Sequence, residues 1–157
     1  MLASRIGKLL REKGLTISLA ESCTGGRLGD KITDIAGSSD YFMGGVISYS
    51  NASKVALLGV SKTVLAARGA VSKEVALQMA RGAMRRFHTD IGVGITGIAG
   101  PTGGSDKKPV GLVFIAVISG KHAICTRNLF KGSRTAVKAQ ATAKAVKMVE
   151  RFVRDNF

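Results

Sequence analysis

Apolar residues along this chain alternate between short continuous runs and helical spacing. The continuous runs, each bounded by glycine or polar residues, predict strands at 15–20, 41–49, 90–97, 110–119 and 122–130. Between these runs, apolar residues three or four positions apart predict helices. Strands and helices therefore interleave early in the chain, whereas two strands follow one another late.

The predicted helices have typical capping residues at their ends. The first helix has Leu2, Ile6, Leu9 and Leu10 on one face and should end at Gly14, which readily adopts the left-handed conformation. The other expected helices are one with Leu28, Ile32 and Ile35 on one face, one capped by Asn51 and running through Leu58 to Gly59, one capped by Ser72 with Val75, Met79 and Ala83 on one face, and a last one over 133–154 that buries Val146, Val149 and Val153.

This order of elements predicts a three-layer α/β/α sandwich around a mixed, mostly five-stranded sheet. A late β-hairpin is expected because only Gly120 and Lys121 separate the last two strands. The chain has 157 residues, with no repeat, low-complexity tract or linker. We therefore expect one domain over residues 1–157.

The charge of the chain is strongly positive. Twenty-four Lys and Arg residues against ten Asp and Glu residues give a net charge of +14, and half of that excess lies in residues 121–157. Such a field attracts anions, whether nucleotides, phosphorylated metabolites or nucleic acid. A solvated basic helix face explains the charge equally well, so the charge alone does not identify a partner.

Cysteine usage and apolar runs suggest where the protein works. Only Cys23 and Cys125 are present, so a disulfide framework is not indicated. No apolar run approaches the roughly 18 to 20 residues of a membrane helix, and the N-terminus lacks the apolar core of a signal peptide. We expect a cytoplasmic protein without a membrane partner.

Polar segments directly follow three of the predicted strands, at 22–26, 50–54 and 96–105. In open α/β sheets, ligands bind beyond the carboxyl ends of the strands, where such loops gather. These three segments are therefore expected to form one site.

The residues available for catalysis are few. His88 and His122 lie outside the three segments, so a histidine base is not favoured, and the histidines and cysteines lack the paired spacing of zinc ligands. Lys54, among small and apolar neighbours, could be partly buried. At an unperturbed pKa of about 10.4, only about one lysine in 2,500 is neutral at pH 7, but burial can lower that pKa. The simpler interpretation is a surface charge.

Several residues could act as a nucleophile or hold an anion. Ser22 begins the turn after a strand, and backbone N–H groups near Gly25 and Gly26 could bind a phosphate or an oxyanion. Helix capping explains the same residues equally well. Cys23 is intrinsically more nucleophilic, although a buried structural cysteine is commoner. Arg134 is a cation in the first turn of the last helix, where an anionic ligand would offset the unfavourable dipole.

Four stretches of the chain together resemble one family. They are "AESCTGG", "ISYSNASKVALLGV", "GAVSKEVALQMARGA" and "GITGIAGPTGGSDKKPVGLVFIAV". In this order, and over essentially the whole chain, they resemble the CinA C-terminal domain family, the nicotinamide-nucleotide amidohydrolases. The resemblance implies deamidation of nicotinamide mononucleotide to nicotinic acid mononucleotide and ammonia, in pyridine-nucleotide salvage, without a metal or cofactor.

The resemblance also implies roles for individual residues. Ser22 matches the nucleophile of a Ser/Lys dyad, Lys54 its base, and Tyr49 a supporting catalytic residue. The residues expected to bind substrate are Thr24, Gly25, Gly26, Thr96, Gly97, Gly100 and Arg134. Arg134 could also keep Lys54 neutral by charge repulsion if the two side chains are close.

Two other functions stay open. A non-catalytic module could use the basic last helix to bind anions or nucleic acid, although few aromatic residues are present for stacking on bases and nucleic acid is not the expected partner. An amidohydrolase could also act on another anionic amide. A homo-oligomer is expected in either case.

Overall fold

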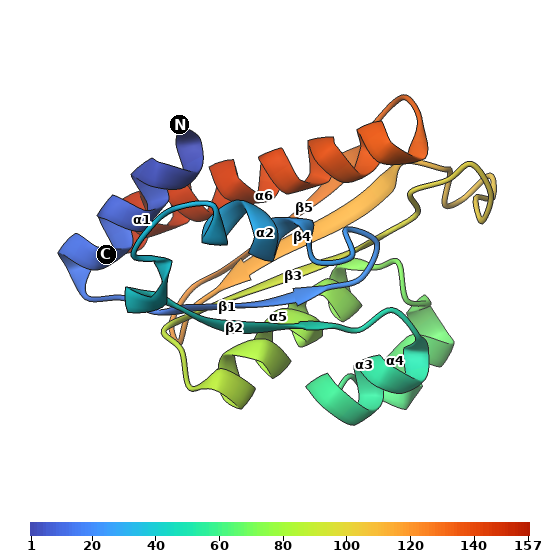
Figure 1. Ribbon diagram of the computed structural model, residues 1–157. Helices are drawn as coiled ribbons and strands as arrows, with labels where there is room; N and C mark the ends of the chain where they lie inside the picture. Colours follow the sequence, from blue (N-terminus) through green and yellow to red (C-terminus); the bar gives the residue numbers. More distant parts are fainter.

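The computed structural model describes residues 1–157 and has three layers (Figure 1). A five-stranded sheet lies between α1, α2 and α6 on one face and α3, α4 and α5 on the other. This arrangement confirms the predicted α/β/α sandwich. The strands are β1 (Ile17–Glu21), β2 (Phe42–Ile47), β3 (Ile91–Gly97), β4 (Leu112–Ile118) and β5 (Ala123–Leu129). The α-helices are α1 (Leu2–Lys13), α2 (Arg27–Thr33), α3 (Asn51–Leu58), α4 (Lys62–Arg68), α5 (Lys73–Phe87) and α6 (Arg134–Asn156), with a 3-10 turn at Ser38–Asp40.

The sheet is mixed, with the strand order β2-β1-β3-β4-β5. Strands β2, β1 and β3 run parallel, whereas β4 and β5 continue the sheet in antiparallel fashion. The carboxyl ends of β1, β2 and β3 therefore meet at one edge. The end of β5, which leads to the start of α6, reaches the same edge. The sheet thus brings together the three polar segments found in the sequence.

The helices differ from the sequence prediction in three respects. Ser50, rather than Asn51, caps α3: its backbone is extended and its Oγ accepts a hydrogen bond from the N–H of Ser53 at 3.0 Å. Asn51 is instead the first helical residue. Helix α4 was not expected because it is short and buries no residue, so it leaves no apolar stripe in the sequence. Helix α2 ends at Thr33, and Ile35 lies beyond it.

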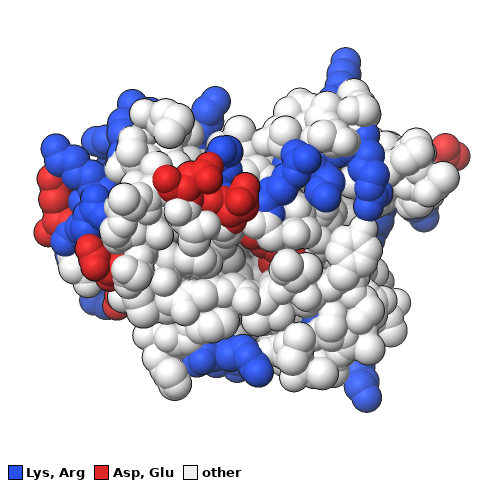
Figure 2. Space-filling view, in the orientation of Figure 1, with Lys and Arg blue, Asp and Glu red and all other residues white.

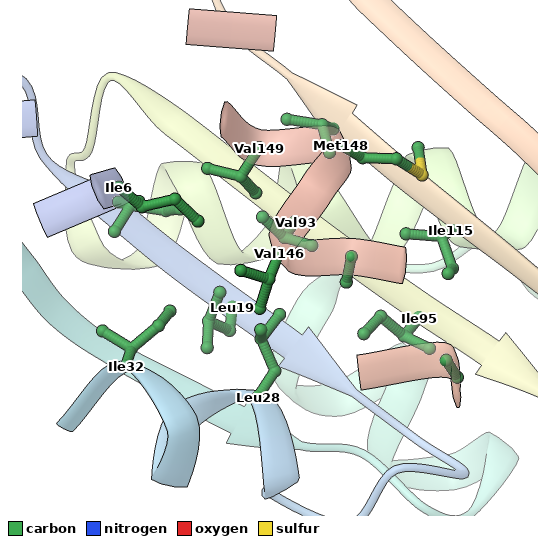
Figure 3. Packing of buried hydrophobic residues seen from close by; sticks show 14 of the residues in the cluster. Ile6, Leu19, Leu28, Ile32, Val93, Ile95, Ile115, Val146, Met148 and Val149 are labelled. Atoms are coloured by element: carbon green, nitrogen blue, oxygen red, sulfur yellow. The ribbon is translucent and has the colours of Figure 1, made fainter. Parts of the chain in front are cut away.

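The larger part of the core lies between the sheet and the layer of α1, α2 and α6. Figure 3 shows Leu19 and Val93 of the sheet facing Val146 of α6, with Leu28 of α2 beside them. All four are buried. This cluster fixes α2 and α6 against the strands whose ends carry the polar segments.

None of the helices combines the length and the apolar character that crossing a membrane requires.

On the opposite face, α5 packs directly onto the backbone of β3. A Cβ atom at Gly94 would overlap the carbonyl oxygen of Ala76, and one at Gly92 would overlap that of Ala80. The same close approach joins α5 to α3, because a Cβ at Gly82 would overlap the carbonyl oxygen of Leu58. Glycine at these positions therefore holds α3 at a fixed distance from the sheet.

This close packing predicts that Gly94→Ala destabilises the fold. The added methyl group must push the backbone of α5 away from β3, and overpacking of this kind costs about 1–3 kcal/mol. The matched control is Gly120→Ala in the hairpin turn, where an added Cβ meets nothing within 4 Å. Urea denaturation should show a lower midpoint for Gly94→Ala alone. Equal midpoints for the two variants would contradict direct packing of α5 on β3.

Candidate functional site

Ser22 and Lys54 lie side by side at the carboxyl edge of the sheet. Ser22 directly follows β1, and its N–H donates to the carbonyl oxygen of Ile95, which extends the pairing with β3. Lys54 lies in the first turn and a half of α3, which begins four residues after β2 ends. The distance between Lys54 Nζ and Ser22 Oγ is 3.0 Å. Two residues 32 positions apart are thus within hydrogen-bond distance.

The surroundings of the Lys54 amine suit its neutral form. Its side chain is 1% exposed, and no carboxylate lies within ion-pair distance of it. Besides Ser22 Oγ, Nζ contacts the carbonyl oxygens of Ser48 at 2.8 Å and Tyr49 at 3.3 Å. Carbonyl oxygens only accept, whereas a hydroxyl can also donate. A neutral amine can therefore give its two N–H groups to the carbonyls and turn its lone pair toward the Ser22 hydroxyl.

Burial lowers the pKa of Lys54 from its usual value. The charged form loses its hydration inside the protein and gains no carboxylate in return. Charge repulsion by Arg134, suggested by the sequence, does not contribute to this lowering. Arg134 instead donates to the carbonyl oxygen of Gly100 at 2.6 Å and to Tyr49 Oη at 2.8 Å.

A cavity of about 250 Å³ opens over this pair. Seven of the predicted site residues line it, namely Ser22, Tyr49, Lys54, Thr96, Gly97, Gly100 and Arg134. Thr96 is buried and its hydroxyl donates to the carbonyl oxygen of Ala70 at 2.9 Å, which ties the segment before α5 to β3. Tyr49 is 60% exposed and lies at the rim. Ala70 and Val71 also line the cavity, and no sequence signal marks them because neither has a reactive side chain.

The other three predicted residues do not reach the cavity. Thr24 is fully buried, and its Oγ1 has no hydrogen-bond partner. Gly25 and Gly26 adopt left-handed conformations in the turn that enters α2. The turn therefore needs glycine for its shape, and the structure does not place these three residues against a ligand in the cavity.

Glu21 occupies the backbone groups that the sequence suggested for anion binding. Its carboxylate is 3% exposed and accepts from the N–H groups of Gly26, Leu28 and Gly29 at 3.1, 3.1 and 2.9 Å. The start of α2 is thus already satisfied by an anion of the protein itself. The N–H of Cys23, by contrast, donates to no other residue, and it directly follows Ser22. It is the better candidate for holding an oxyanion.

Cys23 itself is a poor nucleophile in this setting. Its side chain is 5% exposed, and burial raises the pKa of the thiol to about 11. The reactive thiolate is therefore scarce at neutral pH. Ser22, with an amine at 3.0 Å, has the stronger claim.

The lowered pKa of Lys54 predicts a change in stability with pH that Lys54→Met removes. Between the lowered pKa and the usual value of 10.5, the unfolded chain binds a proton at this lysine and the folded chain does not. The free energy of unfolding of the parent should therefore fall as pH drops through that window, relative to the variant. Urea denaturation at a series of pH values measures the difference, with exposed Lys62→Met as the control. A difference that does not change with pH would contradict the lowered pKa.

Comparison with known proteins places these features in a family. The family model for the CinA C-terminal domain matches residues 1–153. A CinA-like protein of Syntrophus aciditrophicus is 45% identical over 153 residues, which cover 97% of this chain and 36% of that protein. A CinA-like protein of Geobacter sulfurreducens is 47% identical over 146 residues, 93% of this chain and 35% of that protein. The chain thus spans a little over a third of the length of these relatives.

Solved structures agree with this assignment. A competence/damage inducible protein from Agrobacterium tumefaciens is 39% identical, with a TM-score of 0.93 over 98% of this chain and 93% of that one. A competence damage-inducible protein from Klebsiella pneumoniae is 29% identical, with a TM-score of 0.96 over 99% of this chain and 97% of that one. Sequence and fold agree over nearly the whole length, and the chain belongs to the CinA C-terminal domain family.

Proposed function

We propose that this domain is a serine amidohydrolase that deamidates nicotinamide mononucleotide to nicotinic acid mononucleotide and ammonia. Ser22 is the nucleophile and Lys54 is the general base, and neither role needs a metal. The observation that carries the proposal is the 3.0 Å contact between Lys54 Nζ and Ser22 Oγ, made by a buried amine that has no carboxylate partner. A neutral amine next to a hydroxyl is the arrangement by which serine–lysine hydrolases activate serine.

The first half of the reaction forms an acyl-enzyme. Neutral Lys54 takes the Ser22 proton as Oγ bonds to the carboxamide carbon, and the carbonyl oxygen becomes an oxyanion. We assign the hydrogen bond to this oxyanion to the N–H of Cys23, which has no acceptor in another residue. When the oxyanion reforms the carbonyl, the carbon–nitrogen bond breaks and the nitrogen takes the proton from Lys54, leaving as ammonia.

Tyr49 can assist the proton transfer. The Arg134 guanidinium can only donate, so Tyr49 Oη accepts in their 2.8 Å hydrogen bond. The phenolic hydrogen of Tyr49 is then free to point at the substrate. This arrangement supports Tyr49 as a relay, which gives its proton to the leaving nitrogen and regains one from protonated Lys54.

The second half returns the enzyme to its starting state. Neutral Lys54 takes a proton from a water molecule as the oxygen of that water bonds to the ester carbon. The bond between that carbon and Ser22 Oγ then breaks, and Oγ regains the proton from Lys54. The products are free Ser22 and a carboxylic acid, which releases its proton to water and leaves as the carboxylate.

The cavity suits the amide end of such a substrate. At about 250 Å³ it is smaller than the roughly 300–1,000 Å³ of sites that enclose a drug-sized ligand. We therefore expect it to enclose the nicotinamide ring and to leave the ribose and phosphate at the rim, beside Arg134.

The dyad predicts that ammonia release from nicotinamide mononucleotide persists with a chelator and is lost in two variants. Ser22→Ala and Lys54→Ala should each lower kcat by at least about 10³-fold, as expected when one member of a catalytic unit is removed. Lys62→Ala removes an exposed lysine from the neighbouring helix α4 and serves as the control for charge. An enzymatic ammonia assay with purified, folded protein measures all four.

Each alternative has its own outcome in this assay. Activity that survives Ser22→Ala and is lost in Cys23→Ala would move the nucleophile to the cysteine. A folded parent that releases no ammonia from the mononucleotide would reject this substrate and favour another anionic amide. Such a protein, if it also bound DNA with a steep salt dependence, would be a binding module instead.

The role of Lys54 as base predicts a rise of kcat/KM with pH. The base works only when deprotonated, so activity increases as pH passes through the pKa of Lys54 in the free enzyme. Because burial lowers that pKa, the midpoint should lie below the usual lysine value of 10.5. Initial rates at low substrate concentration across a pH series measure it. A rate that falls over the same range would contradict a neutral lysine base.

A further inference from the structure

One face of α6 carries two cations toward the candidate site. Arg134 lines the cavity, and Lys138 lies one helical turn further on, on the same face. The Lys138 ammonium reaches the turn that follows Ser22: a Cβ atom built on Gly25 would lie 3.6 Å from Lys138 Nζ. Lys138 is half-buried there. Lys138 is thus a second cation, beside the turn that follows Ser22 and on the side of that turn that faces α6.

Other features of this region agree with that position. Burial raises the pKa of the Cys23 thiol, and the nearby charge of Lys138 acts against that rise. Figure 2 shows a group of Lys and Arg side chains over α6 and the start of α2. Arg27, the first residue of α2, is tied to this region by a hydrogen bond of 3.3 Å to the carbonyl oxygen of Thr135.

Neither Arg134 nor Lys138 has an anionic partner within the protein. The six ion pairs of the chain include neither Arg134 nor Lys138, and the Lys138 ammonium makes no hydrogen bond. Like charges four residues apart on a helix repel each other. The nearby carboxylate of Glu21 is engaged by three backbone N–H groups and lies beyond 4.0 Å of Lys138. The arrangement therefore lacks an anion.

We propose that Lys138, together with Arg134, binds the phosphate group of the substrate outside the cavity, between Arg134 at the cavity wall and the turn that follows Ser22. This inference rests on the proposed function and names the residue that selects a phosphorylated substrate. Arg134 already donates to Gly100 and Tyr49, whereas all three donors of Lys138 are free. A lysine ammonium binds phosphate as a compact charge and needs no fixed fork geometry. Lys138 is thus a binding residue, and it takes no part in the transfer of protons.

Kinetics with two substrates test this assignment. Lys138→Gln should raise KM for nicotinamide mononucleotide by about tenfold or more, the loss expected for one charge-assisted hydrogen bond, and leave kcat within about threefold. With the same nucleoside lacking its phosphate, parent and variant should have equal kcat/KM. The matched control is Lys147→Gln, an exposed lysine on the opposite face of α6 and roughly 14 Å along its axis. It should match the parent with both substrates.

A structural role for Lys138 would give another pattern. If the lysine only supports the turn after Ser22, Lys138→Gln should lower kcat with both substrates and lower the melting temperature. That result would overturn the proposal, as would an unchanged KM for the mononucleotide.

Binding without turnover separates this proposal from the proposed function. Calorimetry on the parent protein, with nicotinic acid mononucleotide and with inorganic phosphate as probes, should show binding that Lys138→Gln weakens about tenfold or more and Lys147→Gln does not. Such binding in a parent that releases no ammonia would keep the anion site and reject the amidohydrolase. Ammonia release with binding that is equal in parent and Lys138→Gln would keep the amidohydrolase and reject the anion site.

Discussion

The candidate site at the carboxyl edge of the sheet depends on one buried amine, that of Lys54, which has no counter-ion. Placing Lys54 among apolar atoms costs free energy in its charged form, and the protein contains no carboxylate close enough to offset that cost. The neutral amine avoids the cost, and the two carbonyl oxygens and the Ser22 hydroxyl then match its two donors and one lone pair. Burial and hydrogen-bond geometry thus favour the same protonation state, which is the one a general base needs.

The position of Glu21 shows how the fold keeps a nearby carboxylate away from the Lys54 amine. Glu21 and Ser22 are neighbours in sequence, and side chains alternate between the two faces of a strand. Glu21 consequently turns toward α2 and accepts three of its N–H groups, whereas Ser22 turns toward α3 and Lys54. A carboxylate on the same face as Lys54 would pair with the amine and keep it protonated. The sheet keeps the two charges apart.

The architecture was readable in the sequence because short apolar runs and helical stripes coincide with the buried faces of the elements. The capping of α3 was misplaced by one residue, since Ser50 and Asn51 are both good caps and only the backbone conformation distinguishes them. The short helix α4 was missed because it has no fully buried residue and only Val64 and Leu65 pack partly against the core. The prediction that the Ser22, Tyr49 and Lys54 segments meet followed from the parallel order of β1 and β2.

The finer geometry of the site could not be predicted, because it depends on contacts between segments far apart in sequence. Glu21 takes up three N–H groups at the start of α2, whereas the N–H of Cys23 has no acceptor in another residue. Which N–H groups are taken up depends on the direction in which the Glu21 side chain points. Nothing in the sequence distinguishes Lys138 from the other cations of α6. Its proximity to Gly25 is visible only once α6 is docked on the sheet.

The central claim is that burial lowers the pKa of the Lys54 amine in the folded protein and so favours its neutral form. Nitrogen-15 NMR of the lysine Nζ atoms, with Lys54→Met to assign the resonance, measures this state directly. The account predicts one lysine resonance that titrates below 10.5 and apart from the exposed lysines, and that is missing from the variant. A Lys54 resonance that titrates together with the exposed lysines would contradict the account.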